Sequence, residues 1–250
     1  MKVLAINASP NKGRGNTALI LNPFLDGMKT AGAEVELVYT NDLDIKFCRG
    51  CLNCLYSRDG KCPQNDDMQK LYPKLREADI WVFGSPVHAD GVTGPLMNLM
   101  SRTVSFLYPN MEVRNNRCRY PLRAGVKSGK VVLVSNSGFW EIEHFNPLVE
   151  HIKSYCANVS REFVGALLRP HGPALSGLIK FNWPVFSSVL YKDVLEAAKK
   201  AGYQLMKEGK ISPKVLEKIS RSLLPRAAYV AIANRDFKKR LEKSNPKLKK

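Results

Sequence analysis

A long hydrophobic run is absent from this 250-residue sequence. A membrane-spanning helix needs about 20 consecutive apolar residues, and the sequence offers no stretch of that length, so it predicts no membrane span. The N-terminal MKVLAINASPNKG alternates apolar with small polar residues, which is not the pattern of a secretory signal peptide. We therefore expect a cytoplasmic location. In that compartment structural disulfides are disfavoured, and clustered cysteines usually serve metal or redox chemistry.

Acidic residues are scarce relative to basic ones, 22 against 39, which gives a net charge of +17. The excess is concentrated at the C-terminal end, where residues 199–250 hold 16 Lys and Arg but only 4 Asp and Glu. No basic motif with interleaved aromatic residues accompanies this run. We therefore predict a solvated basic tail rather than a nucleic-acid partner. Contact with a polyanion or an anionic membrane surface is the alternative.

Strand and helix patterns alternate through residues 1–170. Patterns of strands occur at 2–7, 34–40, 79–86, 130–139 and 161–168, and helical patterns occur at 17–34, 68–78, 92–107 and 145–159. This alternation predicts an α/β fold, a flavodoxin-like, doubly wound sheet of five parallel strands in the order 2-1-3-4-5. We predict one domain at 1–170 and a basic, helical C-terminal extension at 171–250. Residues 108–129 have the composition of a basic loop.

The sequence SPNKGRGNT, residues 9–17, joins the first predicted strand to the first helix. Gly13 and Gly15 allow a close backbone approach, and a helix N-terminus favours an anion, so a phosphate fits this loop. The loop matches neither G-x-G-x-x-G nor G-x-x-x-x-G-K-[ST], which argues against a standard dinucleotide or nucleoside-triphosphate site. The alternative is an ordinary strand–helix turn capped by Asn16.

Two further loops follow strands at the same predicted edge of the sheet. SPVHADGVTGP, residues 85–95, exposes backbone groups that could hydrogen-bond a planar heterocycle along its edge. Its His88 is either an acid–base group or a partly exposed side chain that only packs in the loop. SNSGFWE, residues 135–141, contains Phe139 and Trp140, which either form a wall for a ring or cover the sheet edge. A phosphate loop followed by these two loops suits a mononucleotide.

Four of the six cysteines lie in one segment, Cys48-x2-Cys51-x2-Cys54-x7-Cys62. The C-x2-C-x2-C spacing and the Cys-Pro pair at its end resemble the ligand run of bacterial ferredoxins, so we predict a [4Fe–4S] cluster bound by all four. Zinc is one alternative, although the usual second cysteine pair downstream is missing. Free or redox-active thiols are another, and their pKa values would be lowered by four nearby cations, Lys46, Arg49, Arg58 and Lys61.

Taken together, these residues resemble the NADPH-dependent FMN reductase family of flavodoxin-like proteins. The resemblance is carried by NASPNKGRGNT, by the cysteine element running into DDM at 66–68, by GSPVHADGVTGPL and by NSGFWE. With its four cysteines the sequence looks most like the iron–sulfur flavoprotein branch, which binds FMN and a [4Fe–4S] cluster. The resemblance covers residues 1–170 and, less specifically, the helical C-terminus.

The resemblance implies roles for ten residues. The residues implied to hold the FMN phosphate are Ser9, Asn11, Asn16 and Thr17. Those implied to face the isoalloxazine ring are Pro86, Val87, His88 and Ala89, with contributions from Ser137 and Gly138 of the third loop. Family members commonly assemble as dimers or tetramers, so the resemblance also implies a homo-oligomer.

These expectations combine into an FMN-binding oxidoreductase that transfers electrons between NAD(P)H, or a ferredoxin-like donor, and an acceptor. FMN exchanges hydride or single electrons and a cluster handles single electrons, so the cofactors would carry out the chemistry. We expect no catalytic nucleophile and no acid–base pair from the protein. The alternatives are a cluster-free NAD(P)H-dependent FMN or quinone reductase, and a flavodoxin-like electron carrier without a substrate of its own.

Overall fold

A computed structural model describes residues 1–181 and 187–244 of the chain. Its main sheet has five strands in the order β2-β1-β3-β6-β7, and every neighbouring pair is parallel. This is the predicted flavodoxin-like order 2-1-3-4-5, with β6 and β7 as the fourth and fifth strands. The strands of this sheet are β1 (Lys2–Asn7), β2 (Glu34–Tyr39), β3 (Ile80–Pro86), β6 (Lys130–Asn136) and β7 (Glu162–Arg169).

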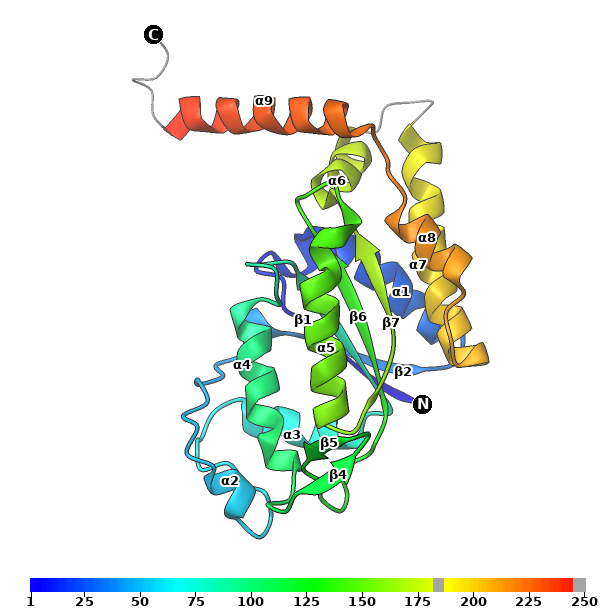
Figure 1. The fold of residues 1–250 in the computed structure, drawn as a ribbon. Coiled ribbons are helices and arrows are strands. Elements are labelled where there is room, and N and C mark those ends of the chain that lie inside the picture. The colour runs from blue at the N-terminus through cyan, green and yellow to red at the C-terminus, as the bar shows by residue number, and fades with distance from the viewer. Residues whose placement is uncertain (182–186, 245–250) are drawn as a thin grey trace.

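Helices cover both faces of the sheet (Figure 1). One face packs against α3 (Met68–Glu77), α4 (Gly94–Arg102) and α5 (Asn146–Asn158). The other packs against α1 (Asn16–Thr30), α7 (Ser187–Glu208) and α8 (Pro213–Ser220). Because successive side chains of a strand point to opposite faces, Leu4 joins the first apolar cluster and Val3 the second. The central strands β3 and β6 are buried in all but one residue each, as expected for a doubly covered parallel sheet.

The C-terminal helices pack against the second face. Helices α1 and α7 approach so closely that a Cβ on Gly27 would overlap the carbonyl oxygen of Lys199, and one on Gly202 would overlap that of Phe24. Helix α6 (Gly172–Phe181) follows β7, and α9 (Arg226–Ser244) projects from the body in Figure 1. The predicted basic tail, residues 199–250, is thus largely helical, in the end of α7, in α8 and in α9, while residues 245–250 lie outside the described residues. The domain division at residue 170 stays a prediction.

One short hairpin corrects the expectation of a loop at 108–129. Strands β4 (Glu112–Arg114) and β5 (Arg117–Arg119) pair antiparallel, separate from the main sheet. Asn115 and Asn116 connect them with φ angles of 54° and 57°. Asparagine tolerates this left-handed conformation, which tight two-residue hairpin turns require. A membrane-spanning helix of sufficient length and apolarity is not found in the described ranges.

Candidate functional site

The three loops singled out in the sequence meet at the carboxyl edge of the sheet. The N–H of Ala8 donates to the carbonyl oxygen of Gly84 at 2.7 Å, and the N–H of Val87 donates to that of Asn136 at 2.9 Å. The Thr93 hydroxyl donates to the carbonyl oxygen of Ala8 at 3.0 Å. These bonds join residues 9–17, 85–95 and 135–141 into one surface, which we call the carboxyl rim. The loops therefore lie together, as the parallel topology predicted.

The first loop leads into α1 through a close approach at Gly15. A Cβ at this position would lie 2.6 Å from the Oγ of Ser9, so a larger residue would fill the space. Ser9 is buried, Asn16 is half-buried and Asn11 is exposed. The start of α1 has no side-chain cap, so Asn16 does not play the capping role that an ordinary turn would give it. In the first helical turn the N–H of Ala18 donates to the carbonyl oxygen of Gly15 at 3.0 Å, and the N–H groups of Asn16 and Thr17 before it suit an anion.

Thr17, expected at a phosphate, directs its hydroxyl to the third loop. The hydroxyl donates to Oδ1 of Asn136 at 2.6 Å, and both side chains are buried. The carbonyl oxygen of Asn136 accepts the N–H of Val87 in the second loop. Asn136 therefore connects all three loops. The sequence analysis missed it as a site residue, although it occupies the end of β6 where such residues are found.

The second loop turns tightly at its tip. The N–H of His88 donates to the carbonyl oxygen of Gly91 at 3.0 Å, and the N–H of Gly91 donates back at 2.9 Å. Ala89 and Asp90 complete the turn with φ angles of 46° and 57°. The His88 side chain is exposed and forms no hydrogen bond or ion pair with any described residue. The residues expected to face a ring are half-buried or exposed at the rim: Pro86, Val87, His88 and Ala89.

The third loop is held in place by hydrogen bonds of Ser137, which is buried. Its N–H donates to the carbonyl oxygen of Arg169 at 3.1 Å, and its own carbonyl oxygen accepts the N–H of Gly172 at 2.8 Å. Its hydroxyl oxygen accepts the N–H of Phe139 at 3.0 Å. Gly138 and Phe139 are exposed, so this loop presents a small residue and one aromatic side chain at the rim.

Trp140, the second aromatic residue of this loop, faces the C-terminal segment instead of the rim. Its indole N–H donates to the carbonyl oxygen of Leu224 at 3.0 Å, and its ring stacks on that of His171. The hydroxyl of Tyr229, in the first turn of α9, donates to the carbonyl oxygen of Gly138. The C-terminal helices therefore border the carboxyl rim, a contact that the sequence did not reveal.

Two buried basic side chains hold this border. Arg169 donates to the carbonyl oxygens of Ile219 and Arg221, each at 2.6 Å. The Nε2 of His171 lies 3.0 Å from the Arg169 guanidinium and accepts the N–H of Leu223 at 3.1 Å. Burial, together with the charge of Arg169, lowers the pKa of His171 to about 4. Burial lowers the pKa of Arg169 to about 10. His171 is therefore neutral at pH 7, and Arg169 is charged.

The cysteine segment, residues 44–64, has one short helix, α2 (Asn53–Tyr56). Cys48 and Cys51 are exposed, whereas Cys54 and Cys62 are buried. Burial, followed by the charges of the other three thiols, raises the pKa of Cys54. This corrects, for Cys54, the expectation that nearby cations lower the thiol pKa values. As placed, no three His, Cys, Asp or Glu side chains among the described residues form a metal site.

Two side chains of α4 hold the N-terminal and C-terminal parts of this segment. Asn98 accepts the N–H of Cys48 on its Oδ1 at 3.2 Å. Arg102 pairs with Asp66 at 2.6 Å, with both side chains almost fully buried, and donates toward the Sγ of Cys62 at 3.4 Å. Burial opposes the charge of Arg102, but the hydrogen bond to Asp66 raises its pKa overall. Helix α4 begins at the second loop, and Asn98 lies four residues along it from Gly94, about 6 Å of helical rise, so Cys48 is bound to a helix that starts at the rim.

Arg123, from the loop before β6, holds the middle of the cysteine segment. Its guanidinium donates to the carbonyl oxygens of Cys54, Leu55 and Ser57 at 3.2, 2.7 and 3.0 Å. The side chain is buried, so these carbonyl oxygens replace water as its partners. The sequence analysis did not identify Asn98, Arg102 or Arg123, because a contact between distant segments leaves no local pattern.

Comparison with known proteins identifies the family to which the chain is similar. Residues 1–135 match the family NADPH-dependent FMN reductase. An iron–sulfur flavoprotein of Archaeoglobus fulgidus is 38% identical over 129 residues, which are 52% of this chain and 62% of the relative. An iron–sulfur flavoprotein of Methanocaldococcus jannaschii is 38% identical over 103 residues, which are 41% of this chain and 52% of the relative. The chain thus spans between half and two thirds of the length of these two relatives.

Solved structures share the fold. An NAD(P)H:quinone oxidoreductase from Methanothermobacter marburgensis superposes with a TM-score of 0.58 at 16% identity, covering 82% of this chain and 96% of that one. An azoreductase from Bacillus anthracis gives a TM-score of 0.57 at 12% identity, covering 83% of this chain and 99% of that one. At these identities the likeness establishes the flavodoxin-like fold.

Proposed function

The chain belongs to the NADPH-dependent FMN reductase family of oxidoreductases, and we propose that it is an FMN-dependent enzyme that also carries an iron–sulfur cluster. It transfers electrons between NAD(P)H, or a ferredoxin-like donor, and an acceptor. The observation that carries this proposal is the carboxyl rim, where three loops are joined through Asn136 beside a segment with four cysteines.

The first loop binds the FMN phosphate. Gly15 leaves the space that a close approach to the backbone requires, and the N-terminal end of α1 favours negative charge. Thr17 contributes its backbone N–H, because its hydroxyl is engaged by Asn136. The proposed contacts to the phosphate are Ser9, Asn11, Asn16 and Thr17.

The second and third loops hold the isoalloxazine. Backbone groups of residues 86–89 orient the ring, since the His88 side chain is exposed and the tip is a turn of backbone hydrogen bonds. Ser137 and Gly138 border the ring from the third loop, and the exposed Phe139 shields it from water. No side chain of the rim is assigned as a nucleophile or an acid–base group.

The cysteine segment fits a [4Fe–4S] cluster in its donor chemistry. Such clusters bind four cysteine thiolates, and four cysteines lie within this one short segment. Arg102 already donates an N–H toward the sulfur of Cys62, and hydrogen bonds to sulfur adjust a cluster's reduction potential. Binding would bring the exposed Cys48 and Cys51 onto the buried Cys54 and Cys62. A segment with little regular structure can make this change without breaking a strand or a long helix.

FMN supplies hydride and single-electron chemistry and a cluster supplies single-electron chemistry. The residues of this chain keep the two sites close, because α4 starts at the ring loop and binds Cys48 through Asn98. A homo-oligomer and a cytoplasmic location complete the proposal. The rival functions are a cluster-free NAD(P)H-dependent FMN or quinone reductase and a flavodoxin-like carrier without a substrate.

Quantification of flavin, iron and sulfide in anaerobically purified protein tests the proposal. We expect FMN together with about four iron and four sulfide per chain, and broad absorbance near 400 nm beside the flavin bands. Cys54→Ser should remove the iron and retain FMN. Cys118→Ser, an exposed cysteine outside the segment, should retain both and serves as the matched control.

Three other results would change the proposal. FMN without iron would leave the cluster-free reductase, and zinc in place of iron would make the cysteine segment a zinc site. Protein that binds no FMN would contradict the proposed function altogether. Steady-state oxidation of NAD(P)H with a quinone or a second flavin as acceptor would argue against the simple electron carrier.

A further inference from the structure

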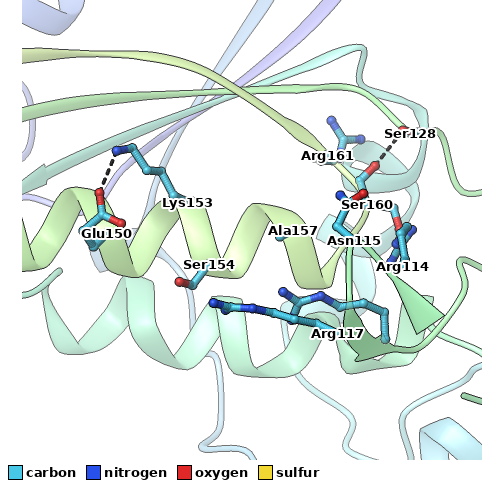
Figure 2. Close-up of a pocket in the computed structure, with 11 residues that line it drawn as sticks. Arg114, Asn115, Arg117, Ser128, Glu150, Lys153, Ser154, Ala157, Ser160 and Arg161 are labelled. Carbon is cyan, nitrogen blue, oxygen red and sulfur yellow. Dashed lines mark hydrogen bonds and ion pairs between the residues drawn. The ribbon is translucent and has the colours of Figure 1, made fainter. Parts of the chain in front are cut away.

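A basic pocket of about 530 Å³ lies at the opposite edge of the sheet from the carboxyl rim. Ser128 shortly precedes β6, and Ser160 and Arg161 precede β7, so these residues mark the amino ends of parallel strands. The hairpin β4–β5 and the C-terminal half of α5 form the other walls (Figure 2). The residues assigned to FMN and to the cluster do not line this pocket, so it is a separate site.

Positive charge dominates the walls of the pocket. The single acidic lining residue, Glu150, is paired with Lys153 at 2.6 Å. Ala157 is the one apolar residue among those that line it, so the walls offer mainly hydrogen-bond donors and charge. The cations that line the pocket are Arg114, Arg117, Arg119, Lys153 and Arg161.

Two of these arginines, Arg117 and Arg119, have no acidic partner among the described residues, and Arg114 has only an exposed one. Arg119 donates to the side-chain oxygen of Asn158, which is a neutral acceptor. Arg114 donates to the neutral Ser160 hydroxyl and lies 3.7 Å from the partly exposed Glu112. The side chain of Arg117 forms no hydrogen bond or ion pair within 1–181 and 187–244. Their charge is therefore available to a ligand.

Arg161 adds a buried cation at the same pocket. It is 5% exposed, its Nη2 donates to three carbonyl oxygens, and its guanidinium lies 3.6 Å from the centre of the Trp81 ring. Its Nε and Nη1, and the Nη2 of Arg114, are buried with no hydrogen-bond partner in the described structure. Burial lowers the pKa of Arg161 to about 10, which still leaves it charged at pH 7. A buried cation without an anion is unfavourable, and a bound anion would compensate it.

We propose that this pocket binds a small oxyanion with several negative charges, an oligophosphate or a tricarboxylate. Arginine pairs with phosphate and carboxylate oxygens through two parallel N–H bonds, so several arginines together select a multiply charged oxyanion. The volume falls in the range of small-molecule sites. Arg117 is the principal ligand because it has no other partner, and the bound anion joins the hairpin to α5.

Calorimetric titration of the full chain loaded with FMN tests this site, with tripolyphosphate and citrate as the two probes. We expect at least one probe to bind with a submillimolar Kd that weakens from 50 to 200 mM NaCl. The double variant Arg117→Gln with Arg119→Gln should weaken binding at least tenfold. Tighter binding of tripolyphosphate would assign the natural ligand to the phosphates, and tighter binding of citrate to the carboxylates.

The matched control removes the same two charges elsewhere. Arg235→Gln with Lys239→Gln, both exposed on α9, has the same net charge as the pocket variant and should bind the probe as the unmodified chain does. Equal loss in both double variants, or no binding of either probe, would overturn the proposal. FMN content should be unchanged in both variants, because the carboxyl rim lies at the other edge of the sheet.

Discussion

The carboxyl rim and the cysteine segment are neighbours, yet different interactions hold them. The loops at the ends of β1, β3 and β6 are joined partly by backbone hydrogen bonds, from Ala8 to Gly84 and from Val87 to Asn136, and partly by the hydroxyls of Thr17 and Thr93. The cysteine segment has one short helix and depends on side chains from elsewhere in the chain, among them Asn98, Arg102 and Arg123. A side-chain substitution leaves backbone bonds in place but removes a side-chain bond. The rim should therefore tolerate single changes better than the cysteine segment does.

Arg102→Met should give the largest effect. It would leave Asp66 as a buried charge without its partner, which costs about 3–5 kcal/mol of unfolding free energy, and it would release the bonds to Lys46 and Cys62. Urea unfolding measures the stability, and iron content shows whether the cysteine segment still binds a cluster. Arg49→Met, an exposed arginine of the same segment, should change stability by less than about 0.5 kcal/mol. Equal effects of the two substitutions would contradict the conclusion that buried side-chain bonds hold the cysteine segment in place.

The pH dependence of stability tests whether the border between the rim and the C-terminal helices also relies on side chains. The pKa of His171 is about 4 in the folded chain and about 6.5 when unfolded, so the unfolded chain binds the proton first on acidification. Neutral His171 therefore stabilises the folded chain fully above pH 6.5. As the pH drops from 6.5 toward 4, the free energy of unfolding falls by up to about 3 kcal/mol. Urea unfolding at pH 7, 5.5 and 4.5 measures this loss.

His171→Gln should flatten that dependence, because glutamine keeps an acceptor for the N–H of Leu223 but does not titrate. His151→Gln on α5 is the control and should retain the slope of the unmodified chain. If His171→Gln retained the full slope, other groups would be responsible and the border would not depend on a neutral histidine.

Thr17→Val should have a moderate effect on the rim. Valine has nearly the same shape but removes the hydroxyl that donates to Asn136, and leaving that buried oxygen without a donor costs about 1–2 kcal/mol. Thermal or urea unfolding measures the change. Thr30→Val removes an exposed hydroxyl bond within α1 and should cost less than about 0.5 kcal/mol. A similar loss for both would show that Asn136 does not join the loops energetically.

Gly15→Ala should have the smallest effect on stability and still reduce FMN binding. The backbone at Gly15 has φ −83° and ψ 162°, which alanine adopts freely, so we expect a change in stability of less than about 1 kcal/mol. The added methyl group meets the Ser9 hydroxyl and fills the phosphate loop, so FMN affinity should fall at least about tenfold. Fluorescence titration measures it. Gly177→Ala, which has open space around it, should bind FMN normally.

Local pattern was enough to predict the main sheet. Five strand patterns alternating with helices allow few topologies, and parallel strands bring their carboxyl ends to one edge. The hairpin β4–β5 escaped prediction, because strands of only three residues are too short for their alternation of polar and apolar residues to stand out from a basic loop. The N-terminal part of α9 is also ambiguous in sequence, since its apolar side chains are mostly exposed and a basic run follows.

The sequence by itself determined the fold, the three loops of the carboxyl rim and the four cysteines, because strand periodicity, turn residues and cysteine spacing are local properties. Tertiary structure alone decided which side chains hold those parts in place and where unpaired charge collects. Asp66 and Arg102 are 36 residues apart, Leu55 and Arg123 are 68 apart, and the basic pocket combines a hairpin, a helix and two strand ends. Such contacts depend on how separate elements pack, and packing leaves no repeating signal along the chain.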